Sequence, residues 1–588
     1  MFLPVPGLDA LWLLLICLSL GVSLIGLGLP LTSAQTRVFA PWAGWGILSG
    51  LMVVWGTLFS LPLSWLLMPL LAIGFLWAVW NVKRLNWWLY PLIAGLILLL
   101  FGSMAEVVMW DDFSHRLGSV LFIYEQDAFP RLGLPTSPSG MPAYPYGLSF
   151  IGQAASLLSG QYEETALAVF GGVQFVFLAA LVMWLWRPNF QHMRPLFALF
   201  LAAGAFAFTT WGNPLFVPKL VFSGYNDVPI GLFLAAALVV ATRLNHALYQ
   251  QEEPWEYALL LGAIGVGIAM QKQVGFLVFA FLGLAFVWPH LWRKTWQQRD
   301  FWLVGLLAGG LPLLLTLIWR WYISVEIPDG EFGFKGISNF HWDKIPDILS
   351  GMGRNIWHAP GLFAPQMIVL GLAAYGWRRR FQTPHLQESI RLAAWLAIAY
   401  NLFMFAAYFM NFSAYEAVRA ASYDRYNMHV SYACWVVVLF AAGAGLQRFV
   451  VARPYVFGVL ACVLAWGLPV ALAERTLIQA APASKQIRQL GQQLRPHIGE
   501  DDRILIYAPQ DSGYINVTLR YELGFKGTNA QQHVHHFRPI PDGMTLKEMI
   551  AKHKIDKLVV IQHDDALRQA FPQFKPGQVI VHDVRSIR

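Results

Sequence analysis

Apolar stretches long enough to cross a bilayer recur through most of the chain, and no other feature limits its fold as strongly. A transmembrane helix needs about 20 predominantly apolar residues, and roughly 14 such windows lie between Leu8 and Val470. The windows are residues 8–30, 42–61, 63–80, 87–108, 163–186, 193–212, 226–244, 255–271, 274–291, 301–321, 361–377, 390–410, 429–447 and 454–473. Because two of the breaks between them are weak, we expect a polytopic α-helical membrane protein with roughly 12–14 spans.

The amino-acid composition agrees with a membrane protein and argues against a nucleic-acid-binding one. Hydrophobic residues make up 57% of the chain and charged residues 13%, whereas an ordinary soluble chain is about 25% charged. The net charge of +8 includes no Lys/Arg run of the length that nucleic-acid-binding tails use, and cytoplasmic loops of membrane proteins collect Lys and Arg. We therefore expect the lipid bilayer as a partner and no nucleic acid.

Basic loops give the expected orientation of the spans. The stretches "NVKRLN", "RPNFQHMR", "WRKTWQQR", "WRRRF" and "RFVVARP" fall on one side of the membrane when the windows are counted in order. The positive-inside rule assigns that side to the cytoplasm. The long connections 109–160 and 322–360, and all residues after about Glu474, then face outward.

The sequence after Glu474 changes character and predicts a small soluble domain. "DDRILIYAP", "IDKLVVIQH" and "GQVIVHDV" indicate short buried strands, and "SKQIRQLGQQL" and "TLKEMIAKHK" indicate helices. This alternation favours an α/β domain with some parallel strand pairing. Since the domain contains no Gly-x-Gly-x-x-Gly or Walker loop, nucleotide binding has no support.

The stretch "MWDDFSHR" places two adjacent carboxylates, Asp111 and Asp112, where an apolar run ends. Repulsion between them is strong at a low-dielectric boundary, so the pKa of one carboxyl is expected to rise unless a cation or strong donors lie nearby. Such a pair suits a general base or a metal site, and His115 is a candidate substrate contact. Alternatively, Asp112 caps the helix that continues through "FSHRLGSVLF", and Asp111 alone acts on the substrate.

A third acidic residue, Asp227, stands at the expected outer end of a span in "SGYNDVPIGLFLAAALVV". Pro229 follows in the first helical turn, so the motif is also explained as a helix start without a further role. The functional interpretation is that Asp227 joins the acidic pair on the outer face and contacts substrate. If the site holds a divalent cation, then Asp111, Asp112 and Asp227 are the candidate ligands.

Four basic residues lie in outward segments or at span ends, where Lys and Arg are normally depleted. They are Lys219, Lys272, Arg419 and Arg425. Charge at this depth costs several kcal/mol unless it is paired or faces water, and the natural ligand of such a group is an anion. For any single residue, snorkelling of the side chain to the interface is the alternative.

A carboxylate base beside cations that suit phosphate fits the transfer of a group from a phosphorylated carrier to a nucleophile. The base would deprotonate an acceptor hydroxyl, and the cations would stabilise the departing phosphate. Neither ATP nor a nucleotide sugar is expected outside the membrane. The donor would therefore arrive through the lipid, as a polyprenyl phosphate.

Four motifs resemble those of the GT-C superfamily of integral-membrane glycosyltransferases, which includes protein O-mannosyltransferases and aminoarabinose transferases. "MWDDFSHR" is similar to the outward acidic motif of these enzymes, and "YNDVPIGLFLA" is similar to a later motif with an acidic residue before a Pro. "QKQVGF", which contains Lys272, resembles a Lys-containing break. "ASYDRYNMH" resembles an Arg-Tyr motif, here Arg425 and Tyr426. The resemblance extends over about residues 87–430.

The resemblance implies a transmembrane catalytic module over residues 87–473, with extra N-terminal spans over 1–86 and an outward soluble domain over 474–588. It also implies inverting transfer of a sugar from a polyprenyl-phosphate donor to a glycan, lipid or protein acceptor of the cell envelope. The implied location is the bacterial inner membrane, with the C-terminal domain outside. Many members place the acidic motif after the first span, whereas several apolar runs precede it here.

Two further groups of residues invite an interpretation as binding sites. Tyr144 and Tyr146, in the loop "DAFPRLGLPTSPSGMPAYPYGLSF", would stack on a sugar or anchor the loop at the interface. The stretch "QQHVHHF" contains His533, His535 and His536, which suggests a metal, although no nearby carboxylate or Cys completes a site. No cofactor is required by the sequence, and a divalent cation is the one candidate.

Two other functions share these features. A transporter or flippase of lipid-linked sugars would place charges near the middle of the membrane and show internal repeats, neither of which is evident in the sequence. A polymerase or ligase that uses a lipid-diphosphate donor on the outer face has the same requirements as the glycosyltransferase.

Overall fold

The apolar windows of the sequence are helical in the computed structural model. Among the described residues, ten helices are long and apolar enough to cross a membrane, and a bent pair, Trp342–His358 with Pro360–Gly376, counts as an eleventh if it is one span. Three further windows form shorter apolar helices, Ser64–Trp80, Pro195–Thr209 and Trp255–Ala269. The prediction of a polytopic α-helical membrane protein is confirmed.

The chain divides into two compact units. The helical unit comprises Met1–Val107 and Ala143–Ile478, and the C-terminal unit comprises Val108–Pro142 and Gln479–Arg588. The structure describes residues 6–135, 137–187, 194–292, 294–327, 340–378, 381, 383–473, 482–499, 502–509, 511, 513–524, 534–536, 545–574 and 580–585.

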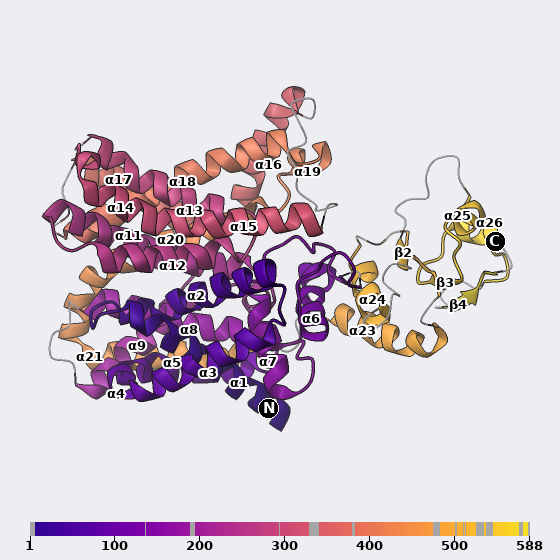
Figure 1. Cartoon of the computed structure of the whole chain (residues 1–588), viewed down its shortest axis with the longest axis horizontal. Helices are drawn as coiled ribbons and strands as arrows, with labels where there is room; N and C mark the ends of the chain where they lie inside the picture. The colour runs from indigo at the N-terminus through magenta and orange to yellow at the C-terminus, as the bar shows by residue number, and fades with distance from the viewer. Residues whose placement is uncertain are drawn as a thin grey trace. The chain divides into compact units, whose positions relative to one another are not determined.

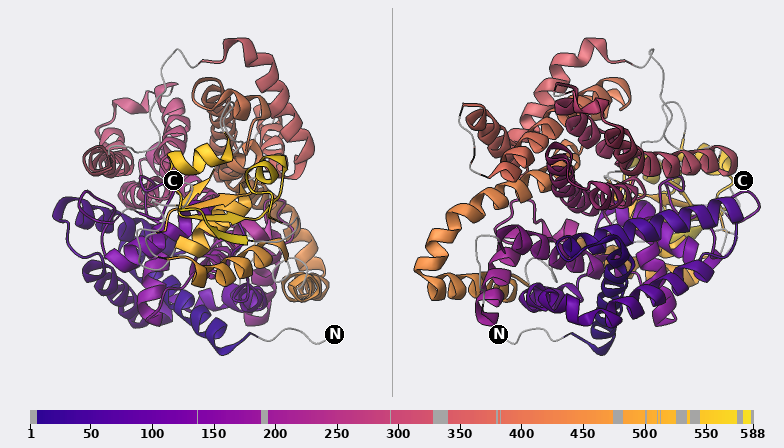
Figure 2. Two further views of the ribbon diagram at one scale, coloured as in Figure 1. Left: turned by 90° about the vertical axis from the view of Figure 1, so that its right-hand side faces the viewer. Right: turned by 60° about the vertical axis from the view of Figure 1, so that its left-hand side comes forward.

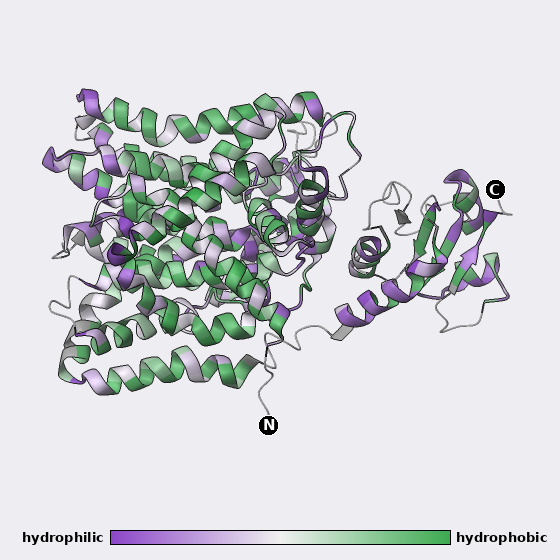
Figure 3. Cartoon of the chain, turned by 60° about the horizontal axis from the view of Figure 1, so that its bottom comes forward, coloured by the Kyte–Doolittle hydropathy of each residue, from purple (hydrophilic) through white to green (hydrophobic). Residues whose placement is uncertain are grey.

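The helical unit is a bundle of helices (Figure 1). Its helices are α1 (Leu8–Gly28), α2 (Ala40–Val54), α3 (Ser64–Trp80), α4 (Val82–Leu85), α5 (Leu89–Gly102), α7 (Ser149–Ser159), α8 (Ala166–Trp186), α9 (Pro195–Thr209), α10 (Pro218–Val221), α11 (Asp227–Gln250), α12 (Trp255–Ala269), α13 (Gly275–Trp292), α14 (Arg299–Gly305), α15 (Leu311–Glu326), α16 (Ile345–His358), α17 (Pro360–Arg378), α18 (Pro384–Met410), α19 (Ala414–Arg419), α20 (Tyr423–Ala452), α21 (Pro454–Cys462) and α22 (Leu468–Ala473). Figure 3 shows that hydrophobic residues dominate these helices.

Close approach of backbones holds part of this bundle together. A Cβ on Gly26 of α1 would lie only 1.7 Å from the carbonyl oxygen of Gly74 on α3, so a glycine at position 26 is what allows the two helices to touch. Small residues at helix contacts are typical of membrane proteins, because lipid gives no hydrophobic drive for helix association and van der Waals packing must supply it.

Two helices of the helical unit begin at polar residues, and a break between two further helices contains polar residues. The apolar helix α11 begins at Asp227, α12 and α13 are separated by residues 270–274, and α20 begins at Tyr423. Because α11 packs against both α12 and α20, these interruptions bring polar side chains together inside an otherwise apolar bundle.

The C-terminal unit contains a four-stranded sheet in the order β2-β1-β3-β4. The strands are β1 (Ile504–Tyr507), β2 (Val534–His536), β3 (Lys557–Val560) and β4 (Ile580–Asp583). β1 pairs in parallel with β2 and β3, and β4 runs antiparallel to β3. Figure 2 shows helices around this sheet, and a hydrophobic cluster lies on each of its two faces. The prediction of an α/β domain with parallel pairing is confirmed.

Helices of the C-terminal unit come from two separate parts of the sequence, residues 108–142 and the residues after 479. They are η5, a π-helix (Asp112–Arg116), α6 (Leu117–Gln126), α23 (Pro482–Leu494), α24 (Tyr514–Gly524), α25 (Leu546–Lys552) and α26 (Asp565–Ala570). The sequence predicts that residues 109–160 are a loop of the transmembrane module, whereas the structure groups residues 108–142 with the soluble domain. The physical reason is that η5 packs against α24.

Candidate functional site

The helical unit contains a buried carboxylate with three basic partners. Asp227 is the first residue of α11, and its side chain is 3% exposed. One carboxylate oxygen lies 3.0 Å from Lys272 Nζ and 2.7 Å from His429 Nε2, and the other lies 3.5 Å from Arg425 Nε. Ionised groups are found at such depth only when they are paired, so the four side chains form one electrostatic cluster.

Local sequence explains how each partner reaches Asp227. Lys272 lies in the break between α12 and α13, and the break is tight because a Cβ on Gly275 would lie 2.0 Å from the carbonyl oxygen of Ile268. Arg425 and His429 are four residues apart on α20 and therefore lie on one face of that helix. The N-terminus of α11 adds the positive end of a helix dipole beside the carboxylate.

Aromatic rings surround the two cations. Lys272 Nζ lies 4.8 Å from the centre of the Tyr426 ring, and the Arg425 guanidinium lies 4.9 Å from the ring of Tyr225 and 5.3 Å from that of Tyr426. Cation–π contacts of this kind strengthen when water is excluded. The rings therefore hold both cations in place while the Lys272 and Arg425 side chains keep 10% and 19% of their surface exposed.

A tyrosine fixes the orientation of the histidine. The Tyr400 hydroxyl lies 3.0 Å from His429 Nδ1 and 3.0 Å from the backbone carbonyl oxygen of Tyr426, so these two acceptors share its proton. Because an ionised carboxylate only accepts hydrogen bonds, the proton on the other ring nitrogen, Nε2, points to Asp227. The cluster carries one positive charge overall when His429 is neutral, because two cations face one carboxylate.

Two buried amides next to the cluster have side-chain atoms for which the described part of the chain supplies no hydrogen-bond partner. The Gln271 side chain is 0% exposed and Asn226 is 2% exposed. Among the described residues, neither amide atom of Gln271 has a partner, and the same holds for Asn226 Oδ1. Asn226 Nδ2 does donate to the backbone carbonyl of Gln271. Buried polar groups are usually satisfied, so these atoms are candidates for contact with substrate hydroxyls.

The structure separates the four predicted anion-binding residues into two groups. Lys272 and Arg425 meet at Asp227 together with Tyr426. Lys219, on α10, is exposed, and Arg419 is exposed on α19, where its guanidinium stacks 3.9 Å from the centre of the Tyr415 ring. Within the described part of the chain, neither Lys219 nor Arg419 forms an ion pair with Asp227.

The two predicted sugar-stacking tyrosines are enclosed by the helical unit. Tyr144 is 9% exposed and Tyr146 is 1% exposed, and the Tyr146 ring meets the edge of Trp319 at 5.9 Å. The next residue, Gly147, donates its backbone N–H to the carbonyl of Met270 at 2.8 Å. This segment therefore packs on the break that contains Lys272. Nothing in the sequence indicated this contact.

The acidic pair lies in the C-terminal unit, at the start of η5. Asp112 is 0% exposed and Asp111 is half-buried. The expected capping role of Asp112 is not what the structure shows: Asp111 occupies the position before the helix, without a side-chain capping hydrogen bond, and Asp112 is inside the first turn. His115 is buried, with Nδ1 at 2.7 Å from Ser114 Oγ.

No group of three potential metal ligands occurs among the described residues. His533 lies outside the described residues, and His535 and His536 are described only as backbone of β2. Asp111 and Asp112 offer hard oxygen ligands of the kind that Ca²⁺ and Mg²⁺ prefer, and their fit to a cation stays a prediction.

His429, Tyr400, Asn226 and Gln271 were not predicted as site residues. For His429 the sequence does carry a signal, because it follows Arg425 by one helical turn in "DRYNMHV". The role of Tyr400 has no comparable signal, since it comes from α18, a separate helix.

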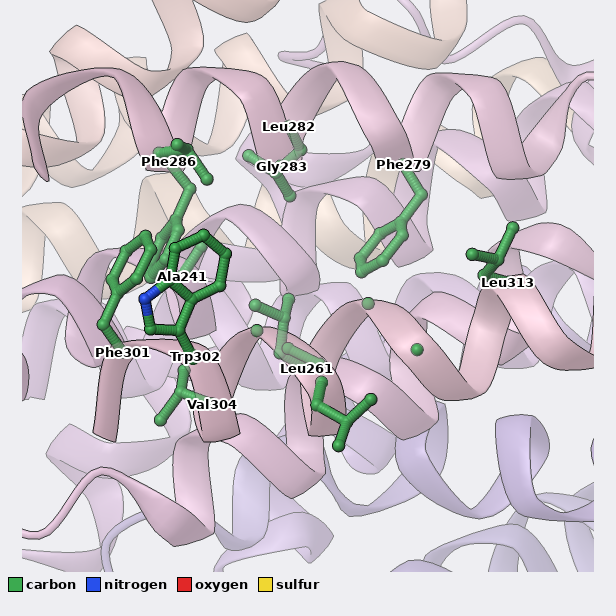
Figure 4. A pocket seen from close by; sticks show the side chains of 16 residues that line it. Ala241, Leu261, Phe279, Leu282, Gly283, Phe286, Phe301, Trp302, Val304 and Leu313 are labelled. Atoms are coloured by element: carbon green, nitrogen blue, oxygen red, sulfur yellow. The ribbon is translucent and has the colours of Figure 1, made fainter. Parts of the chain in front are cut away.

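An apolar pocket of about 510 Å³ lies elsewhere on the helical unit. Figure 4 shows side chains of α11 to α15 around it, including Leu261, Phe279, Phe286, Phe301 and Leu313. Phe279 is on α13, which begins three residues after Lys272. The lining contains no charged residue, so the pocket suits a hydrocarbon chain.

Comparison with known proteins gives matches to solved structures only. No protein-family model matches the sequence, and a search of the curated proteins found no match. ArnT from Cupriavidus metallidurans in the apo state matches with a TM-score of 0.45 at 14% identity, over 85% of this chain and 98% of that chain. ArnT from the same organism bound to undecaprenyl phosphate matches with a TM-score of 0.44 at 15% identity, over 82% of this chain and 88% of that chain. The Archaeoglobus fulgidus oligosaccharyltransferase in complex with Zn and sulfate matches with a TM-score of 0.39 at 11% identity, over 80% of this chain and 67% of that chain.

Proposed function

We propose that the protein is a membrane glycosyltransferase that transfers a sugar from a polyprenyl-phosphate donor to a cell-envelope acceptor on the outer face of the bacterial inner membrane. The observation that carries the proposal is the buried cluster of Lys272, Arg425 and His429 around Asp227. The order of the four motifs that resemble the GT-C superfamily agrees with it.

The charge of the cluster suits the donor. A sugar attached through a phosphodiester carries one negative charge, which the single net positive charge of the cluster balances. Asp227 neutralises one cation and holds both in place, and the exposed parts of Lys272 and Arg425 are left to meet the phosphate. Asn226 and Gln271 are positioned beside these cations and would accept or donate hydrogen bonds to sugar hydroxyls.

The departing phosphate carries more negative charge than the donor does, so cations at the site are needed most as the donor bond breaks. When the bond between the anomeric carbon and the phosphate oxygen breaks, a phosphate monoester leaves, and its charge at neutral pH is about −1.5 to −2. Two fixed cations therefore stabilise the developing charge more than the starting charge, which lowers the barrier.

Asp111 is our candidate general base. Its carboxylate would take the proton of the acceptor hydroxyl as that oxygen forms a bond to the anomeric carbon and the bond to the phosphate oxygen breaks, with inversion of configuration. Asp111 is half-buried whereas Asp112 is 0% exposed, so Asp111 is the better placed of the two to contact an acceptor.

A lipid carrier agrees with the apolar pocket of the helical unit. The apolar pocket adjoins α13, the helix that begins next to Lys272. Undecaprenyl phosphate, to which one of the ArnT structures is bound, is a carrier of this chemical class. A glycan, a lipid or a protein hydroxyl would serve as acceptor.

The experiment uses the purified full-length protein with a panel of synthetic polyprenyl-phosphate and polyprenyl-diphosphate sugars. Lys272→Gln and Arg425→Gln should abolish donor binding, because each removes a cation from a buried site. Lys219→Gln and Arg419→Gln are matched controls, since both remove a cation outside the cluster, and they should keep donor binding.

Equal donor binding by all four variants would contradict the phosphate assignment. If only diphosphate donors are turned over, the donor is a polyprenyl diphosphate sugar. If a labelled lipid crosses the bilayer of liposomes without any sugar transfer, the protein is a transporter. Addition of EDTA tests the divalent cation: loss of turnover that Mg²⁺ or Mn²⁺ restores would show that one is used.

A further inference from the structure

The acidic turn is packed against two helices from the far end of the chain. Tyr514, at the start of α24, donates its hydroxyl hydrogen to the backbone carbonyl of Val108 at 2.6 Å. The Phe113 ring lies 6.3 Å from the ring of Tyr514 and 5.3 Å from that of Tyr521. Val108 precedes Asp111 by three residues and Phe113 follows it by two, so contacts flank the acidic pair on both sides.

A charged residue of α23 completes this contact. The Arg488 guanidinium lies over the Phe113 ring at 5.6 Å from its centre. Arg488 Nε also donates to Glu522 of α24 at 2.6 Å, which ties the two helices to each other. Since Phe113 is 3% exposed, its ring is enclosed and the turn has little freedom to move.

The loop that follows the turn closes its other side. The backbone N–H of Gly140 donates to the carbonyl of Ser114 at 2.8 Å, and Ser119 Oγ donates to Ser139 Oγ at 3.1 Å. A Cβ on Gly118 would lie 2.8 Å from the backbone nitrogen of Ser139. The turn is therefore held from both directions within the C-terminal unit.

The Tyr514 phenol stays a hydrogen-bond donor over the whole physiological range. Burial raises its pKa above the usual value. The hydroxyl therefore keeps its proton at neutral pH, as the hydrogen bond to Val108 requires.

We propose that α23 and α24 of the C-terminal domain position the acidic turn for catalysis, with Tyr514 and Arg488 as the positioning residues. Neither side chain is assigned a contact with substrate. Both act through the backbone of Val108 and the ring of Phe113, and so hold the turn of backbone that carries Asp111. The inference rests on the proposed role of Asp111 and gives the C-terminal domain a role in the reaction.

The test compares Tyr514→Phe with Tyr507→Phe in the full-length protein. Tyr514→Phe removes one hydroxyl and keeps the ring that packs on Phe113. Tyr507→Phe is the matched control, because it removes a hydroxyl on strand β1 of the same domain that donates to Asp564, the residue before α26, at 2.8 Å. Hydrogen–deuterium exchange of peptides covering 108–116 and steady-state kinetics are measured for both.

Tyr514→Phe should increase exchange within 108–116 and lower kcat about three- to tenfold, the effect of losing one hydrogen bond, while KM for the donor changes less than twofold. Tyr507→Phe should change neither. Arg488→Met, which keeps an unbranched side-chain stem but removes the guanidinium, should act in the same direction as Tyr514→Phe.

Unchanged exchange in Tyr514→Phe, or increased exchange with an unchanged kcat, would each overturn the positioning role. Failure of the proposed function gives a different result. In that case Asp111→Asn keeps full turnover, whatever the exchange of 108–116 shows.

Discussion

Replacement of Asp227 by Asn gives the sharpest test of the buried cluster, because it removes one charge and almost no volume. The variant leaves Lys272 and Arg425 without their carboxylate, at separations that were 3.0 and 3.5 Å. At an effective dielectric constant of about 20, a pair of unit charges 3.0 Å apart interacts by about 5 kcal/mol. Breaking a buried pair from one side costs about 3–5 kcal/mol, so we expect a loss of unfolding free energy in that range.

The control is an exposed pair with almost the same separation between its charged atoms. Asp343 and Lys344 lie 3.2 Å apart, but the Asp343 side chain is 76% exposed, compared with 3% for Asp227. Asp343→Asn should therefore cost less than about 1 kcal/mol. Unfolding is followed by tryptophan fluorescence in mixed micelles as the fraction of SDS rises, because the chain has 26 Trp.

The double variant Asp227→Asn/Lys272→Gln completes the cycle. It removes one of the two uncompensated cations, so it should be more stable than Asp227→Asn alone. If Asp227→Asn costs no more than Asp343→Asn, water reaches the cluster freely and the argument from burial is wrong. If the double variant is less stable than Asp227→Asn, the two side chains are not coupled by charge.

Three further predictions concern topology, catalysis and the helix break. A reporter fused after Arg588 should be outside the cytoplasm, because the basic loops occupy the opposite side; a cytoplasmic reporter would remove the reason for a lipid donor. Asp111→Asn should keep donor binding and lose about 10²–10⁴ in turnover, as loss of a general base does, and turnover near that of the parent would exclude Asp111 from this role. Gly275→Ala should destabilise the protein because its Cβ would lie 2.0 Å from a backbone oxygen, whereas Gly283→Ala on the same helix, with nothing within 4 Å, should not; equal stability of the two would show that the break tolerates a side chain.

The membrane fold could be predicted because hydropathy is a local property. Each of the predicted windows contains a helix, even where the helix is too short or too bent to count as a span by itself, as in α9 and the α16–α17 pair. The strands β1, β3 and β4 were found for the same reason, since each is a short apolar run. β2 and α24 were missed because their residues are polar or mixed and only packing selects their conformation.

The site could be predicted only in part, because pairing between distant residues has no local signature. Asp227 and Lys272 each stand out at the end of an apolar run, yet the sequence does not show that they meet. His429 and Asp227 are 202 residues apart. Lys219 had the same local signal as Lys272 and is exposed on α10, so a basic residue at a span end does not reveal by itself whether the fold buries it beside a carboxylate.

The long sequence separation between the acidic turn and its supporting helix has a consequence for biosynthesis. Tyr514 and Val108 are 406 residues apart, and at about 5–20 residues per second a ribosome needs roughly 20–80 s to travel from one codon to the other. During that interval the turn emerges and waits without α24, while most of the helical unit is synthesised. The last part of the chain to be translated therefore completes the surroundings of Asp111, and a prematurely terminated polypeptide enters the membrane with its acidic turn unsupported.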